Sequence, residues 1–160
     1  MPPVRISLPE CIFIGDGVVI HEGIWISIVR AHSGIEPRIE IGDQTRIGRF
    51  CQLSCVGEIV IQEEVLISDQ VQIGDTYHEY EDPDLPSTKQ GLAPPRPVLI
   101  KRGALLNLGV VVLPGITIGE SAYVEEGSVV TRDVPAGATA SGNPARIVEP
   151  RGKPTVRAPR

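Results

Sequence analysis

The sequence predicts an all-β chain folded as one parallel β-helix, and three observations support this prediction. The first is a repeat of six, because aliphatic residues recur at every sixth position from Ile100 to Val130. The second is composition: aromatic residues make up only 4% of the chain, and 17 glycines and 15 prolines favour short strands and turns. The third is length, since 160 residues suit one domain that needs no disulfide or metal to hold its core.

The repeat of six divides the chain into four runs of short strands. Its members are Ile14, Ile20 and Ile26; Ile41, Ile47 and Leu53; Ile61, Ile67 and Ile73; and Ile100, Leu106, Val112, Ile118, Val124 and Val130. Strand side chains alternate sides every two residues, so a period of six with glycine at a fixed phase indicates short segments separated by corners. Three segments close a triangular coil, and stacked coils bury the aliphatic residues in one column. An ordinary β-sandwich would need irregular spacing within 100–135, which the sequence does not have.

Three stretches depart from the repeat and predict loops. The stretches 27–38 and 59–61 shift the repeat slightly, whereas about 74–97 interrupts it completely. Solenoids accommodate extra residues at their corners, so we expect one large protruding loop at about 74–97. The folded domain is expected over 1–148, because the tail 149–160 is basic, rich in proline and without aliphatic period, and should be loosely ordered.

Charge and cysteine content argue against several kinds of partner. A net charge of −5 offers no basic surface for nucleic acid. No run approaches the ~18 apolar residues of a membrane span, and the opening residues "MPPVRISLPE" do not read as a signal peptide. Three cysteines do not make a disulfide framework, and Cys51 and Cys55 lack the spacing of a metal site. We therefore expect a cytoplasmic protein without a metal.

The C-terminal half resembles the hexapeptide-repeat acyltransferases. The segments that carry the resemblance are "LPGITIG" (113–119), "GSVVTRDVP" (127–135) and "GNPAR" (142–146). The resemblance implies a left-handed β-helix, which is an exception to the usual right-handed crossover. It also implies a homotrimer with acetyl-CoA in the grooves between neighbouring copies. The segment "HEYEDPDLP" (78–86) further resembles the branch that acetylates sugars and polysaccharide or lipopolysaccharide precursors, and more distantly the galactoside and maltose acetyltransferases.

The resemblance places the family's catalytic histidine at His78, just inside the interrupted stretch. Acyl transfer from a thioester needs a base for the acceptor's proton, a donor for the oxyanion and a place that excludes water. A flat β-helix face has no pocket, but a long loop supplies a wall. An unperturbed imidazole has a pKa near 6.5 and accepts a proton at neutral pH. We therefore expect direct transfer of an acetyl group from CoA to a sugar hydroxyl, with His78 as general base.

The resemblance also implies residues for the acceptor and the cofactor. For the acceptor we expect Ser54, where relatives have an asparagine, together with Tyr77, Tyr80 and Asp82 on the loop. For acetyl-CoA we expect backbone groups near Leu108, Ala140 and Gly142, and the side chains of Thr131, Arg132 and Arg146. Arginine suits phosphate because its guanidinium donates to two oxygens at once. At each of these positions an ordinary solvent-exposed or corner residue remains the alternative.

Two other functions are compatible with the same fold. A γ-type carbonic anhydrase needs three zinc-binding histidines, but the two besides His78, namely His21 and His32, match no such motif and are expected at the surface. A trimeric scaffold without catalysis stays open, because Thr76 replaces a second histidine of many relatives. Asn107 and the pair Glu125–Glu126 also depart from the family pattern.

Overall fold

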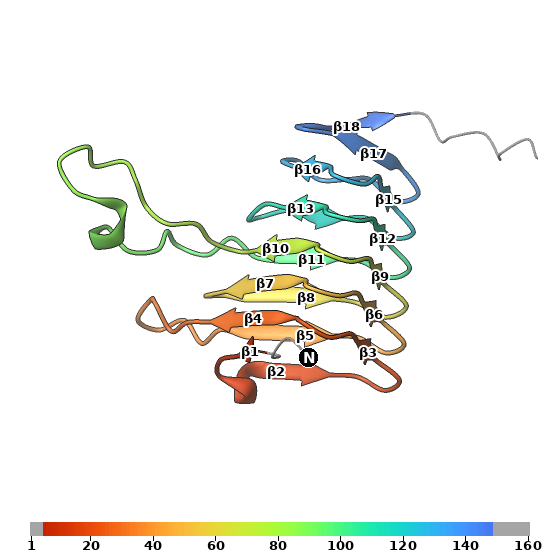
Figure 1. Cartoon of the computed structure of the whole chain (residues 1–160), viewed down its shortest axis with the longest axis horizontal. Helices are drawn as coiled ribbons and strands as arrows, with labels where there is room; N and C mark the ends of the chain where they lie inside the picture. The colour runs from red at the N-terminus through yellow and green to blue at the C-terminus, as the bar shows by residue number, and fades with distance from the viewer. Residues whose placement is uncertain (1–4, 149–160) are drawn as a thin grey trace, which may run out of the picture.

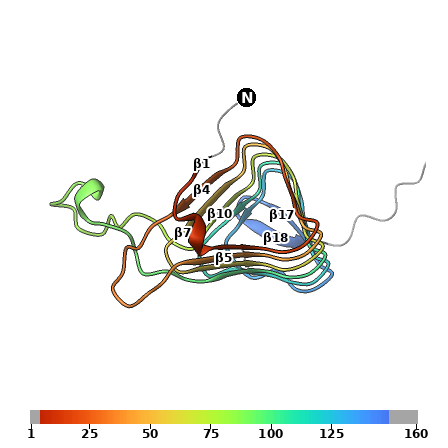
Figure 2. The ribbon, with the colours of Figure 1, turned by 90° about the horizontal axis from the view of Figure 1, so that it is seen from below.

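A computed structural model describes residues 5–148 as a parallel β-helix of triangular cross-section (Figures 1 and 2). The strands form three sheets, one on each side of the triangle. Sheet A contains β1 (Arg5–Ile6), β4 (Trp25–Ile28), β7 (Gln52–Cys55), β10 (Gln72–Gly74), β13 (Val111–Val112) and β16 (Val129–Val130). Sheet B contains β2 (Ile12–Ile14), β5 (Arg38–Ile41), β8 (Glu58–Ile61), β11 (Val98–Ile100) and β14 (Thr117–Ile118). Sheet C contains β3 (Val19–Ile20), β6 (Arg46–Ile47), β9 (Leu66–Ile67), β12 (Leu105–Leu106), β15 (Tyr123–Val124), β17 (Thr139–Gly142) and β18 (Ala145–Val148).

The chain passes from sheet A to B to C in every complete coil, and the paired strands are parallel except β17 and β18, which form an antiparallel end. The two helical elements of the described residues are three-residue 3-10 turns, η1 (Pro9–Cys11) and η2 (Ser87–Lys89). No helix within residues 5–148 is therefore long enough to cross a membrane. The predicted all-β fold is confirmed, and the predicted tail 149–160 lies outside the described residues.

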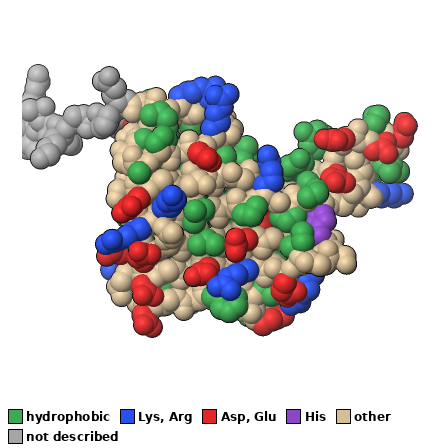
Figure 3. Space-filling model, turned by 180° about the vertical axis from the view of Figure 1, so that it is seen from behind, with side chains coloured by type: hydrophobic (Ala, Val, Ile, Leu, Met, Phe, Trp, Pro, Cys, Tyr) green, Lys and Arg blue, Asp and Glu red, His purple; other side chains and the backbone are tan. Residues whose placement is uncertain are grey.

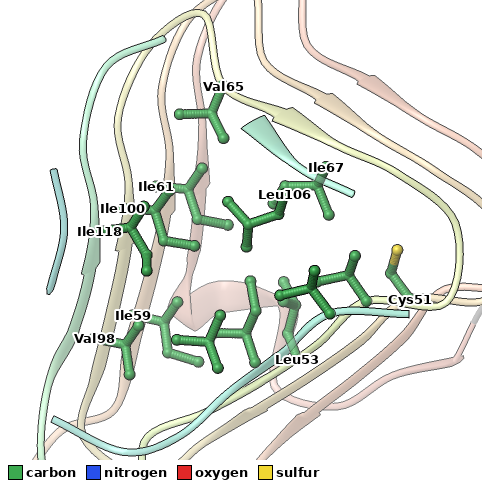
Figure 4. Close-up of a cluster of buried hydrophobic side chains, with 14 of the residues drawn as sticks. Cys51, Leu53, Ile59, Ile61, Val65, Ile67, Val98, Ile100, Leu106 and Ile118 are labelled. Carbon is green, nitrogen blue, oxygen red and sulfur yellow. The ribbon is translucent and has the colours of Figure 1, made fainter. Parts of the chain in front are cut away.

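Thirteen of the fifteen residues of the six-residue repeat form the core column. The expectation fails in the first coil, where Ile14 is 55% exposed and Ile20 is half-buried, because β2 and β3 are the end strands of sheets B and C. Ile100 lies in register with Ile61 in the coil below and with Ile118 in the coil above, and each of the three is 0% exposed. Figure 4 shows these side chains pointing into the triangle beside Leu106 and Ile67 from sheet C. Burying each such side chain contributes roughly 1.5–3 kcal/mol, so the repeat supplies a large share of the apolar stabilisation.

The corners use two different residues of each repeat. A Cβ atom on Gly48, which follows the aliphatic Ile47, would lie 2.6 Å from the backbone carbon of Ser68 in the next coil. That glycine therefore permits close stacking rather than a turn. The turn itself comes from a residue with positive φ, which recurs at intervals of six along each run. These residues are Gly17, Gly23, Gln44, Phe50, Glu64, Gln70, Gly103, Gly109, Gly115, Ser121 and Gly127.

One of the two small predicted loops exists and the other does not. Residues 29–37, here called the short loop, connect β4 to β5 and confirm the expected excursion at 27–38. The expected loop at 59–61 is wrong, because β8 runs through Glu58–Ile61 without interruption. Only two residues separate β7 from β8, so this corner is tight. The four-residue strand that follows it buries both Ile59 and Ile61, which lie two positions apart. The repeat shifts because the strand is longer.

The large interruption forms an arm of residues 75–97 between β10 and β11. The arm and the short loop leave the same corner of the triangle, between sheets A and B (Figures 1 and 2). Acidic side chains gather on the arm (Figure 3), which carries Glu79, Glu81, Asp82 and Asp84. The predicted protruding loop is thus confirmed within one residue of its expected bounds.

Candidate active site

Three of the predicted site residues line one cavity where the arm leaves sheet A. The cavity has a volume of about 320 Å³ and contains Ser54, Tyr77 and His78 in its wall. Its other lining residues are Ser27, Val29, Gln52, Cys55, Val56, Thr76 and Leu92. Sheet A forms one side of this cavity and the arm forms the other, as expected for a flat face that acquires a pocket from a loop.

A short antiparallel ladder at the base of the arm holds His78. His78 pairs with Leu92 across the two limbs of the arm. On either side, the Ala93 N–H donates to the Tyr77 carbonyl at 2.9 Å and the Glu79 N–H donates to the Gly91 carbonyl at 3.1 Å. The backbone of His78 is therefore fixed by its neighbours, while its side chain is exposed at the cavity.

Asp75, the first residue of the arm, fastens this ladder to the β-helix. Its side chain is 0% exposed, and its two carboxylate oxygens accept from the N–H groups of Val56 at 2.9 Å and Gly57 at 2.7 Å. Its backbone carbonyl accepts from the N–H of Arg96 at 2.8 Å, near the end of the arm. One buried residue thus ties the corner to the outgoing limb through its carboxylate and to the returning limb through its backbone carbonyl.

The arm carries a second cavity, which shares Tyr77 with the first. This cavity has a volume of about 380 Å³, and its wall includes Asp82 and two further acidic residues, Glu79 and Glu81. The ring of Tyr80 lies 6.3 Å from the ring of Tyr77, but Tyr80 is 69% exposed. Of the predicted acceptor residues, Tyr77 and Asp82 are therefore connected to His78 through neighbouring cavities, whereas Tyr80 lines neither of them.

The predicted cofactor residues lie apart from His78 within one copy of the chain. Arg132, Ala140 and Arg146 line a separate cavity of about 140 Å³ near the C-terminal end of the β-helix. Thr131 is exposed beside Arg132, and the Gly142 N–H donates to the Ser128 hydroxyl at 3.2 Å. Leu108 is half exposed and lines a groove of about 410 Å³ at the corner between sheets C and A.

Comparisons with known proteins point to acetyltransferases. No protein-family model matches the chain. A candidate acetyltransferase of Schizosaccharomyces pombe is 33% identical over 98 residues, which are 61% of this chain and 46% of that protein. A candidate acetyltransferase of Saccharomyces cerevisiae is 32% identical over 110 residues, 69% of this chain and 55% of that protein. The chain thus spans about half the length of these curated relatives.

Solved structures confirm the expected left-handed β-helix. A hexapeptide-repeat acetyltransferase of Vibrio cholerae superimposes with a TM-score of 0.74 at 26% identity, covering 88% of this chain and 74% of that one. The same Vibrio protein is also known in complex with acetyl-CoA. A maltose O-acetyltransferase of Clostridium difficile gives 0.69 at 28% identity, covering 88% and 71%. The N-acyltransferase AntD of Bacillus cereus, bound to dTDP and coenzyme A, gives 0.76 at 21% identity over 94% and 78%, which shows the fold alone.

Cys55 lines the cavity beside His78 but is a poor nucleophile. It is 1% exposed, and burial, with the negative charge of Asp75 beside it, raises the pKa of its thiol to about 12. Only roughly one thiol in 10⁵ is then ionised at pH 7, and the thiolate is the reactive form. Within residues 5–148 no group of three or more histidine, cysteine or acidic residues is placed to hold a metal ion.

Sequence reasoning missed four residues of this region. Ser27 and Gln52 line the cavity, yet each reads in the sequence as an ordinary outward strand residue. Asp75 carried a usable signal, since it directly follows the last repeat before the arm. His32 was expected at the surface, but it is half-buried and its Nε2 lies 3.1 Å from the Ala93 carbonyl of the arm. Sequence offered no sign of this contact, because the two residues are 61 positions apart.

Proposed function

We propose that the chain is an acetyl-CoA-dependent O-acetyltransferase whose acceptor is a sugar hydroxyl. The observation that carries this proposal is the shared cavity of His78 and Ser54. It occurs in a chain that resembles hexapeptide-repeat acetyltransferases in sequence motifs and in fold. The Clostridium neighbour is by name a maltose O-acetyltransferase, which supports a sugar or a polysaccharide precursor as the acceptor class.

His78 acts as the general base in the proposed reaction. Acetyl-CoA supplies the thioester carbon, and His78 accepts the proton of the acceptor hydroxyl as its oxygen bonds to that carbon. The C–S bond then breaks, and His78 returns the proton to the leaving sulfur. Ser54 donates a hydrogen bond to the carbonyl oxygen as it gains negative charge, or orients the acceptor hydroxyl. The un-ionised thiol of Cys55 supports direct transfer without an acyl-enzyme.

We assign the acceptor to the part of sheet A beside the arm. Ser27 and Ser54 lie in register on neighbouring strands. Gln52 lines both the cavity that contains His78 and Ser54 and a smaller cavity of about 170 Å³. These side chains are neutral and form hydrogen bonds, which suits a polyhydroxylated ligand. From the arm, Tyr77, Tyr80 and Asp82 are the proposed contacts to the sugar.

We assign acetyl-CoA to a groove between copies of the chain. Arg132 and Arg146 share a cavity and suit the phosphates, with Thr131, Ala140 and Gly142 nearby. Leu108 lies on a different corner from His78. A closed homotrimer would bring the groove of one copy against the arm of its neighbour, since heterologous contacts that close give a ring with equivalent sites.

The free thiols of all three cysteines support a reducing location such as the cytoplasm.

CoA release from acetyl-CoA with a panel of glycosides, nucleotide sugars and amino sugars tests this proposal. His78→Ala is expected to lower turnover by about 10²–10⁴-fold. Acetyl-CoA should still raise its melting temperature, because a ligand that binds the folded state stabilises it. Lys89→Ala, at the exposed η2 turn of the same arm, is the matched control and should keep full turnover.

Unchanged release by His78→Ala would reject His78 as the base. Failure of the unaltered protein both to release CoA and to be stabilised by acetyl-CoA would instead favour the non-catalytic trimeric scaffold.

A further inference from the structure

The short loop reaches across the corner to the base of the arm. The short loop connects β4 to β5, and the arm connects β10 to β11, so one intervening corner, Val56–Gly57, separates the two excursions. His32 spans this distance, and its Nε2 lies 3.1 Å from the backbone carbonyl of Ala93. A carbonyl only accepts, so the ring nitrogen that faces it carries the proton.

The Ala93 carbonyl collects two side-chain hydrogen bonds from different parts of the chain. Thr76 Oγ1 donates to it at 2.7 Å from the outgoing limb, and His32 Nε2 approaches from the short loop. Ala93 is 4% exposed, so both lone pairs of its carbonyl are satisfied within the protein rather than by bulk water. Threonine and histidine therefore clamp one point on the returning limb.

That point is directly connected to His78. The Ala93 N–H donates to the carbonyl of Tyr77, and Leu92 pairs with His78 in the same ladder. A displacement of Ala93 would move both limbs of the ladder and hence the imidazole of His78 relative to Ser54 on the rigid sheet. Loops held by few hydrogen bonds open locally at low free-energy cost, so each bond at this base affects how often His78 is in place.

We infer that His32 is a positioning residue that clamps the returning limb of the arm and thereby holds His78 over the cavity. The catalytic consequence rests on the proposed function, whereas the clamp itself does not. His32 does not line the cavity, so it exerts its effect through Ala93 and not by contact with substrate. It supplies a tether from outside the arm, in addition to the one that Thr76 supplies from within.

Hydrogen exchange of the arm and steady-state kinetics together test the inference. In His32→Ala, the amides of Ala93 and Glu79 should exchange about fivefold faster, the factor expected when one typical hydrogen bond is lost. The kcat should fall by a similar factor while the KM for acetyl-CoA stays unchanged. In His32→Gln, the side-chain Nε2 can still donate to Ala93, so both exchange protection and kcat should return toward the parent values.

Ser33→Ala, an exposed neighbour in the same loop, is the control and should match the parent in both measurements. Exchange in His32→Ala as slow as in the parent would overturn the inference, as would equal losses in His32→Gln and His32→Ala. Absence of turnover in the parent would reject the proposed function alone, because exchange reports on the clamp without any substrate.

Discussion

Pro95, on the returning limb of the arm, lies so close over Gly57 that a Cβ atom added to the glycine would come 2.5 Å from the Pro95 Cβ. The corner therefore has no side chain where the arm crosses it. The same two-residue corner donates both of its N–H groups to the Asp75 carboxylate. The arm is thus fitted to the corner by shape on one side and by hydrogen bonds on the other.

Gly57→Ala should displace the returning limb of the arm. The proline ring is rigid and the corner is buried, so the limb must move to admit the methyl group, and overpacking of this kind costs about 1–3 kcal/mol. We expect faster exchange of arm amides and turnover lowered at least fivefold, because the ladder that holds His78 would shift. Hydrogen exchange and CoA release measure the two effects.

A second glycine of this region provides the matched control. A Cβ on Gly74 would meet its nearest atoms only at 3.6 Å and beyond, so Gly74→Ala should leave arm protection unchanged. The double variant Gly57→Ala with Pro95→Gly should recover protection, since the clashing ring is removed. Normal exchange in Gly57→Ala would show that the limb does not depend on this contact.

Asp75→Asn should destabilise the whole β-helix. An asparagine of the same shape keeps one acceptor oxygen but presents an NH₂ group to a backbone N–H, so one buried hydrogen bond is lost. Hydrogen bonds to charged groups contribute about 1.5–3 kcal/mol each, and the free energy of unfolding should fall by that amount in urea titrations. Asp84→Asn, on the exposed part of the arm, should change it by less than about 0.5 kcal/mol. Equal stability of both variants would contradict a structural role for Asp75.

The parts of the fold that sequence predicts are those encoded by local spacing. Ile100 and Ile118 belong to one uninterrupted run and lie 18 positions apart, so their register follows from counting, and the arm follows from where counting fails. The loop expected at 59–61 was wrong because spacing alone does not distinguish an extra residue from a longer strand. Both change the distance between inward residues in the same way.

The site could be predicted only where a resemblance supplied it. His78, Ser54 and Tyr77 were expected from family motifs and do share a cavity. His32 and Asp75 act through hydrogen bonds to residues 61 and 18–19 positions away. Such contacts depend on which coils are neighbours and on where each corner points, which a repeat of six does not specify.

Ile100→Ala should test the core column. Ile100 is 0% exposed between two other isoleucines of the repeat, so removing its side chain leaves a cavity and should cost about 2–5 kcal/mol of unfolding free energy. Leu99→Ala on the same strand is the control. Leu99 points outward and is half-buried, so its loss should cost at most about 1 kcal/mol. A larger loss of unfolding free energy in Leu99→Ala than in Ile100→Ala would show that the face of β11 that carries Leu99, and not Ile100, is in the core.

Cys55 should make the protein less stable at alkaline pH. Its thiol pKa is raised to about 12 in the folded chain, against about 8.5 when unfolded. Below pH 8.5 the Cys55 thiol keeps its proton in both the folded and the unfolded chain, so its full contribution to the free energy of unfolding is present. As pH rises from there toward 12, the unfolded state loses its proton first, so stability falls by up to about 1.4 kcal/mol per pH unit.

Cys55→Ser removes this titration while nearly conserving side-chain volume. Urea unfolding at pH 8 and pH 10 should show the parent losing about 1–2 kcal/mol more than the variant over this interval, and the comparison cancels the tyrosines and lysines that both proteins share. Parallel losses in the two proteins would mean that the Cys55 thiol ionises as easily in the folded chain as in the unfolded one. In that case a nucleophilic thiol beside His78 would again have to be considered, and alkylation of Cys55 by iodoacetamide at pH 8 would distinguish it from the direct transfer proposed for this site.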